Sequence, residues 1–251
     1  MRHAIVAFLG ATALSVASAQ MATAADMPTK APAYAPVAMY NWTGFYLGGQ
    51  VGGGWASNTV THVDGGTAFP AGFVDNAITS SGILGGVYGG YNYQINQFLI
   101  GIDGDYSFAS LTGSGPDVSP VNGDIDNHSD KVKWLSTVTG RLGYVNNNWL
   151  FFGKGGWGWA GFSGNSTLVT PGGALVNTST SSTTRNGWTL GAGVEWGFLP
   201  NWSAKLEYDY VKFSTDNFNS TQTSAAGVVT TPARSATSDL NEVKLGVAYR
   251  F

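Results

Sequence analysis

Residues 240–251 read LNEVKLGVAYRF, and their side chains alternate between two kinds. One face of a strand here would carry Val243, Leu245, Val247, Tyr249 and Phe251, and the other Glu242, Lys244, Gly246, Ala248 and Arg250. A strand in a transmembrane β-barrel needs this pattern, because lipid lies outside the wall and a packed polar lumen lies inside it. An edge strand of a soluble sandwich can also end in phenylalanine, so this stretch alone leaves both classes open.

Seven more segments show the same period-two alternation and lack proline, as the interior of a sheet requires. They are residues 43–55, 83–94, 98–109, 132–144, 149–162, 185–198 and 202–213. Glycine and β-branched residues crowd these segments, which argues against helices. Tight turns at 95–97, 145–148 and 199–201 alternate with long polar connections at 56–82, 110–131, 163–184 and 214–239.

This spacing predicts an all-β fold, an eight-stranded antiparallel transmembrane β-barrel with short periplasmic turns and four long extracellular loops. The even strand number places both termini in the periplasm. A soluble, lipocalin-like barrel is the alternative. That barrel would require the large aromatic side chains to fill the lumen while the charged residues face solvent.

The alternation also sorts each strand into an outward apolar set, which includes Val132, and an inward polar set. The inward set contains six acids and six bases: Asp103, Asp105, Lys133, Arg141, Lys154, Glu195, Lys205, Glu207, Asp209, Glu242, Lys244 and Arg250. A lysine or arginine facing lipid would cost about 2–4 kcal/mol at the bilayer midplane, which forces the inward assignment. Eight strands enclose just enough space for side chains, so we expect ion pairs to plug the lumen.

Catalysis is an alternative use of the inward carboxylates. Asp103/Asp105 and Glu207/Asp209 are pairs spaced two residues apart, so the members of each pair face the same way. The bases predicted nearby favour a structural ion-pair network instead.

The N-terminal residues indicate export, and the rest of the chain is expected to form one large domain. Residues 1–25 have the positive start and short apolar run of a secretory signal, and residues 26–42 form a proline-rich periplasmic tether before a barrel at 43–251. The absence of cysteine excludes disulfides and thiolate metal sites. Removing Arg2 with the signal leaves 11 basic against 15 acidic residues, which argues against a nucleic-acid partner.

The loops offer few candidates for chemistry. Lys212 combines an outward register with a position beside a loop, so we predict a contact with a lipopolysaccharide phosphate there. Residues 124–130 resemble a cation loop but lack the glycine and distal glutamate of an EF-hand. Residues 153–158 match G-x-G-x-x-G without a following helix, so a nucleotide site is not expected. His62 and His128 leave a haem or metal site, or a Ser-His-Asp hydrolase, as alternatives that local spacing does not support.

Several segments resemble one known family. They are residues 40–55 (YNWTGFYLGGQVGGGW), 134–144 (WLSTVTGRLGY), 188–196 (WTLGAGVEW) and 249–251 (YRF). The chain is similar to the alphaproteobacterial porin-like outer-membrane proteins, the RopB and 25/31-kilodalton immunogenic proteins. The resemblance implies an abundant outer-membrane barrel related to the OmpA-type transmembrane domain. Some members of that family are described as porins or haemin binders, but the matched motifs carry neither activity.

We therefore expect a non-enzymatic barrel that supports envelope integrity and surface interaction, with no catalytic residue, metal or cofactor. A small-solute porin is the first alternative, and a haem-binding or lipid-modifying barrel the second. The expected partners are outer-membrane lipid, lipopolysaccharide and the barrel-assembly machinery, for which Tyr249 and Phe251 form the C-terminal assembly signal. Homo-oligomerisation is left open.

Overall fold

The structure is a computed structural model that describes residues 40–63, 72, 74, 78–118, 125–224 and 227–251. The predicted signal and most of the predicted tether lie outside these residues. Among the described residues, no helix has both the length and the apolar character needed to cross a membrane.

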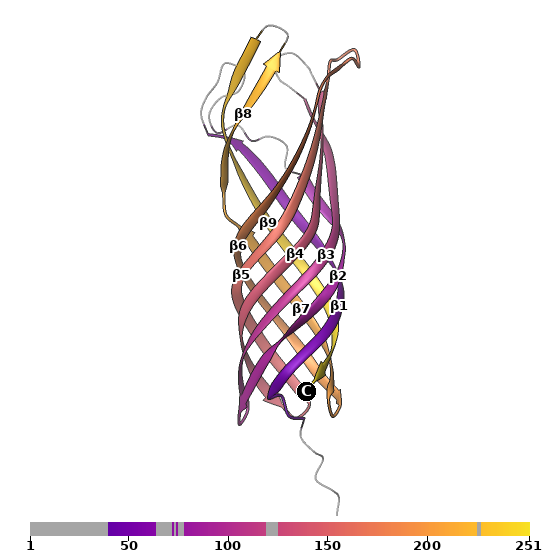
Figure 1. Cartoon of the computed structure of the whole chain (residues 1–251), viewed down its shortest axis with the longest axis vertical. Helices are drawn as coiled ribbons and strands as arrows, with labels where there is room; N and C mark the ends of the chain where they lie inside the picture. The colour runs from indigo at the N-terminus through magenta and orange to yellow at the C-terminus, as the bar shows by residue number, and fades with distance from the viewer. Residues whose placement is uncertain (1–39, 64–71, 73, 75–77, 119–124, 225–226) are drawn as a thin grey trace, which may run out of the picture. The chain divides into compact units, whose positions relative to one another are not determined.

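The described chain forms one sheet of nine antiparallel strands. They are β1 (Gly44–His62), β2 (Ile78–Ile95), β3 (Phe98–Val118), β4 (Ile125–Asn146), β5 (Trp149–Val169), β6 (Leu175–Leu199), β7 (Trp202–Phe213), β8 (Asp216–Ser224) and β9 (Gly227–Arg250). Neighbours pair in chain order up to β7, which pairs with β9, and β9 pairs back onto β1. Strands β1 to β7 and β9 thereby close an eight-stranded barrel, and β8 lies outside this ring of strands. The closed barrel confirms the predicted fold class (Figure 1).

The two ends of the barrel differ. At the short-turn end, two-residue connections follow β2, β4 and β6, and Asn96 and Asn147 adopt the left-handed backbone (φ of 56° and 54°) that asparagine tolerates. We call the opposite end the hairpin end, because there the paired strands continue as hairpins through much of the predicted long connections. β5 and β6 stay paired out to Val169 and Leu175, and among the described strands β8 pairs only with β9 (Figure 1). The predicted loop bounds at this end were therefore too wide.

Side chains alternate across the wall as lipid outside and charge inside require. On β7, Leu206 is 47% exposed and its neighbour Glu207 only 2%. On β9, Val247 is 45% exposed, whereas Lys244 is fully buried. The large apolar side chains of the other strands are likewise exposed on the outer face, so the outer wall is apolar and aromatic.

One strand departs from the predicted alternation. The register between β4 and β5 shifts between Val132 and Trp134, which makes Lys133 the extra residue of a β-bulge. Val132 is buried, whereas Lys131 and Lys133 are exposed. The predictions that Val132 faces outward and that Lys133 faces the interior are therefore wrong. An extra residue moves every side chain beyond it to the opposite face, and the sequence alternation did not reveal the bulge.

The bulge generates a labelling prediction, and the absence of native cysteine makes it simple to test. A spin label on Lys133→Cys should relax strongly with lipid-soluble oxygen, because that side chain lies on the outer wall. A label on Val132→Cys should be shielded.

Leu206→Cys is the matched control for a lipid-facing site, and Ala248→Cys for an interior site. If the Lys133 label behaved like the Ala248 label, the bulge assignment would be refuted.

Candidate functional site

The barrel interior is the candidate site, because it holds nearly all the inward residues singled out from the sequence. Its side chains form three successive layers along the strands. On β7, for example, the inward residues run from Lys205, Glu207 and Asp209 to the apolar pair Val211 and Phe213. The layers are described below from the short-turn end to the hairpin end.

An aromatic and aliphatic cluster occupies the interior at the short-turn end. Its buried members are Tyr40, Trp42, Leu99, Val145, Leu150 and Phe152. Trp42 is fully buried, and Arg250 Nη1 donates a hydrogen bond of 2.6 Å to its carbonyl oxygen. Residues 40–42, which were assigned to the tether, therefore belong in part to the barrel interior. The chain enters the barrel here because the aromatic rings find apolar partners on β3, β4 and β5.

A second apolar cluster lies toward the hairpin end. It consists of Ala56, Leu111, Val132, Leu135, Ala160, Val211, Phe213 and Leu240, all buried and drawn from six strands. Phe162 packs edge-on against Phe213, with ring centroids 5.2 Å apart. Sequence reasoning missed both apolar layers. A signal for them was present, since the cluster members on strands share the inward parity of the buried polar residues of the same strands, apart from Val132 beyond the bulge.

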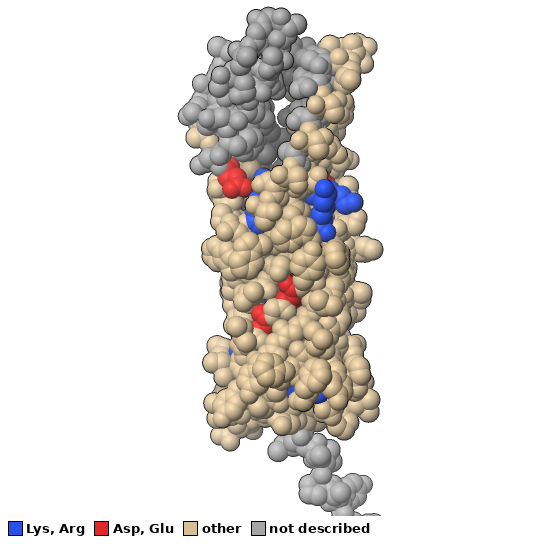
Figure 2. All heavy atoms as spheres, in the orientation of Figure 1, with Lys and Arg blue, Asp and Glu red and all other residues tan. Residues whose placement is uncertain are grey.

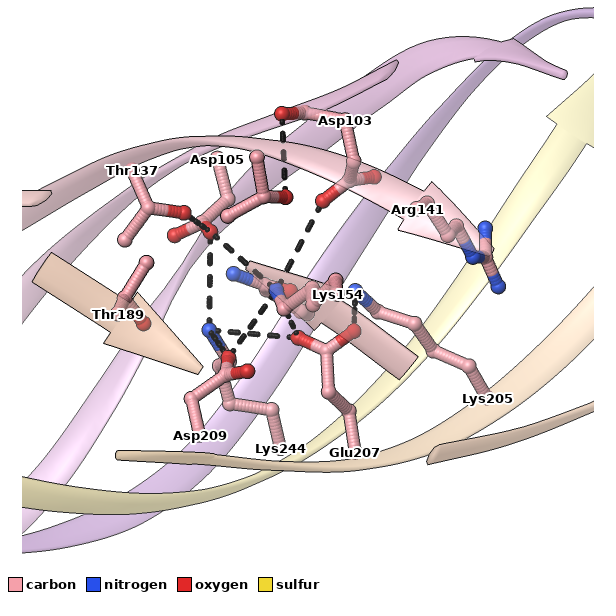
Figure 3. Close-up of polar contacts among 12 residues, drawn as sticks. Asp103, Asp105, Thr137, Arg141, Lys154, Thr189, Lys205, Glu207, Asp209 and Lys244 are labelled. Atoms are coloured by element: carbon pink, nitrogen blue, oxygen red, sulfur yellow. Dashed lines mark hydrogen bonds and ion pairs between the residues drawn. The ribbon is translucent and has the colours of Figure 1, made fainter. Parts of the chain in front are cut away.

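An ion-pair network fills the layer between the two clusters, and Lys154 on β5 lies at its centre. Lys154 Nζ is 2.8 Å from Glu207 Oε1, 3.1 Å from Asp209 Oδ2 and 3.8 Å from Asp103 Oδ1. Asp105 Oδ2 lies 3.9 Å away (Figure 3). All these side chains are almost fully buried, so low local dielectric strengthens each contact.

Lys244 on β9 is the second shared cation. Its Nζ lies 2.6 Å from Asp209 Oδ2, 3.2 Å from Glu242 Oε2 and 3.5 Å from Glu207 Oε1. Lys205 adds a third ammonium, 3.2 Å from Glu207 Oε2 and over the face of the Tyr88 ring. Lysines from three strands thus bind carboxylates from β3, β7 and β9, and Figure 3 shows those of β3 and β7.

Two arginines form a separate group near the short-turn end. Arg141 pairs with Glu195, and Arg250 Nη2 lies 3.7 Å from the other oxygen of the same carboxylate. Ser203 donates a further hydrogen bond of 2.6 Å to Glu195. The Arg141 guanidinium also stacks 3.7 Å from the Phe152 ring centroid, so the charged layer continues into the aromatic one.

Neutral donors add a hydrogen bond to each of two acids. Tyr46 donates a 2.5 Å hydrogen bond to Asp103 Oδ2, and Thr137 donates one to Asp105.

The space that the Tyr88 ring occupies in the interior depends on two glycines. A Cβ added at Gly48 or Gly246 would lie 2.7 or 2.8 Å from its Cε1 atom, closer than real Cβ contacts allow.

The structure brings eleven of the twelve predicted network residues into the interior and leaves out Lys133. Among the described residues, the buried charges are therefore six acids and five bases, instead of the predicted six and six. Glu195 has two arginines, so five carboxylates share three lysines in the central layer. The paired carboxylates Asp103/Asp105 and Glu207/Asp209 all lie within 4 Å of Lys154.

Lys212, the residue predicted for contact with lipopolysaccharide, lies apart from this network. Within the described part of the chain, no three His, Asp or Glu side chains are grouped so as to hold a metal ion. Lys212 Nζ lies 4.0 Å from Asp239 Oδ1, and the predicted lipopolysaccharide contact at Lys212 stays a prediction. The side chain of His62 lies outside what the structure describes, as do Asp124 and the side chain of Asp126 in the segment that resembles a cation loop.

The proposed assembly signal lies at the short-turn end of the wall. Tyr249 and Phe251 face outward, and their rings pack edge-to-face with centroids 5.2 Å apart. Trp202 on β7 packs against Tyr249 in the same way at 5.3 Å. These three rings form part of the outer aromatic surface, and recognition of the signal stays a prediction.

Comparison with known proteins agrees with this architecture. Residues 8–251 match the family model described as outer membrane protein beta-barrel domain. A 31 kDa outer-membrane immunogenic protein of Brucella melitensis biotype 1 is 33% identical over 227 residues, covering 86% of this chain and 89% of the relative. A 22 kDa outer membrane protein of Rhizobium leguminosarum bv. viciae is 31% identical and covers 84% of this chain and 79% of the relative.

Among solved structures, the outer membrane protein OprG from Pseudomonas aeruginosa aligns with a TM-score of 0.50 at 13% identity, over 84% of this chain and 98% of OprG. At that identity the likeness concerns the fold alone. The family match and the two relatives confirm the resemblance drawn from the strand motifs. The chain belongs to the outer membrane protein beta-barrel family, among the relatives of the alphaproteobacterial outer-membrane immunogenic proteins.

Proposed function

We propose that this protein is a non-enzymatic, structural barrel of the outer membrane whose lumen is closed to solutes. The observation that carries the proposal is the order of the three interior layers along the barrel. An apolar cluster lies on each side of the ion-pair network. A diffusion channel needs a continuous water-filled path, which eight strands scarcely provide even with small side chains. In this proposal, the barrel wall supports the integrity of the cell envelope, and the hairpin end takes part in interactions at the cell surface.

The energetics of the central layer support a permanently closed lumen. Opening a path past Lys154 would separate it from four carboxylates that lie within 4 Å. Removing one partner of a buried ion pair typically costs about 3–5 kcal/mol, because the other charge stays buried without compensation. Lys244 shares three of these carboxylates, so neither lysine can leave without disturbing the other.

We further propose that the short turns face the periplasm and the hairpin end faces the outside. Outer-membrane barrels have short periplasmic turns and longer extracellular connections, and this chain has the same asymmetry. The relatives are named immunogenic, which supports an exposed hairpin end in this family.

Conductance is the direct test of a closed lumen. Purified, folded protein in planar bilayers should give no large, steady and reproducible current steps, because the two apolar clusters and the ion-pair network between them occupy the lumen. Such steps would instead favour a small-solute porin and overturn the proposal.

Replacement of Lys154 tests the network itself. Lys154→Met should lower the free energy of unfolding by about 3–5 kcal/mol, since it leaves clustered buried carboxylates short of a cation. Urea unfolding of the barrel in detergent micelles, followed by tryptophan fluorescence, measures this change.

Lys133→Met is the matched control, because the sequence predicted both lysines to lie inside and only Lys154 does. The control should change stability by less than about 0.5 kcal/mol, as an exposed position without a network allows. Equal losses in the two variants would argue against a special role for the interior layer.

Orientation can be read with epitope tags on intact cells. A tag between Gly172 and Gly173, in the connection from β5 to β6, should bind antibody without permeabilisation. A tag between Asn147 and Asn148 should bind only after the outer membrane is opened. The reverse pattern would invert the proposed orientation.

A further inference from the structure

The outer wall carries two lysines that the sequence did not place together on this surface. The bulge at Lys133 turns both Lys131 and Lys133 outward on β4, where an alternation continued unbroken from Leu135 would have turned both inward. Both are exposed, and they lie two residues apart on one strand toward the hairpin end. Figure 2 shows basic side chains gathered near that end, above a wall that is largely uncharged.

Hydroxyl groups flank the two ammonium groups. Lys131 is in register with Thr112 on β3 and with Ser163 on β5, so the three residues form one row across three strands. Ser110 on β3 is exposed beside them. Ammonium and hydroxyl donors on one surface suit an anionic group with several acceptor oxygens, such as a phosphate.

An aromatic surface continues from the lysines toward the short-turn end. Phe108 is 69% exposed and is in register with Trp134, whose ring stacks on Tyr106 at 6.1 Å with an interplanar angle of 14°. Trp159 is exposed on the adjacent strand β5. Trp and Tyr mark the height of the bilayer interface, so the lysines lie where headgroups meet the wall and the rings lie where acyl chains begin.

The charge of this pair is not neutralised within the described part of the chain. Lys131 and Lys133 form no ion pair with any described carboxylate, whereas Lys212 lies 4.0 Å from Asp239 and Arg185 lies 3.1 Å from Asp216. Two unpaired cations next to a lipid-facing aromatic surface favour an anionic lipid over a protein partner or a free ion, because only a lipid satisfies both surfaces at once.

We propose that Lys131 and Lys133 bind a phosphate of lipopolysaccharide, with its acyl chains against Phe108, Trp134 and Trp159. The choice of lipopolysaccharide over phospholipid rests on the proposed orientation, which places the hairpin end in the outer leaflet. Lys212, the contact predicted from the sequence, makes a smaller contribution because Asp239 already pairs with it.

Lipid binding to the whole folded protein in a neutral detergent tests the site. Native mass spectrometry would measure the affinity for bisphosphorylated lipid A, with phosphatidylglycerol as the competing phospholipid. Lys131→Gln/Lys133→Gln should weaken lipid A binding roughly 25-fold, the effect of two basic residues that each contribute about a factor of five. Lys131→Arg/Lys133→Arg should stay within about threefold of wild type, because it keeps both charges.

Lys212→Gln is the matched control and should change the affinity less than about twofold. Heat-modifiable migration on gels verifies that each variant is folded. An affinity of the double glutamine variant within about twofold of wild type would overturn the proposal, as would a larger loss in Lys212→Gln. Tighter binding of phosphatidylglycerol than of lipid A would overturn the choice of lipid. The assay does not depend on orientation or conductance, so its failure is distinct from a failure of the proposed function.

Discussion

The pairing of β1 with β9 is the interaction on which the rest of the structure depends. It runs from Tyr46 opposite Arg250 to His62 opposite Arg234 and joins the first barrel strand to the last. Without it, two strand edges would expose unpaired backbone N–H and C=O groups to hydrocarbon, which costs several kcal/mol for each group. Closure also encloses a lumen, so every inward side chain must find its partners among the other inward side chains.

The narrowness of that lumen determines what its side chains can be. Three lysines and five carboxylates share the central layer, and inward glycines such as Gly48 and Gly246 make room for the large Tyr88 ring. An apolar cluster lies on each side of these buried charges. This arrangement strengthens each ion pair and penalises the loss of any one member.

A single irregularity in β4 links the interior to the outer surface. The bulge at Lys133 moves one cation out of the lumen and brings Val132 into the apolar cluster. It thereby leaves the interior with more acids than bases and gives the outer wall a pair of lysines above aromatic rings. A bulge is often used to redirect a side chain in this way, and here it serves packing and charge placement together.

The sequence by itself determined the barrel, the outward and inward faces of most strands and eleven of the interior charges. It could do so because alternation with period two is a local property, and because a charge facing lipid is too costly to tolerate. Only the tertiary structure decided on which face of the wall Lys133 lies, that Tyr40 and Trp42 are buried, and which carboxylate each lysine binds. Those outcomes depend on register shifts and on contacts between residues far apart in the chain, such as Arg250 with Trp42, which no local pattern encodes.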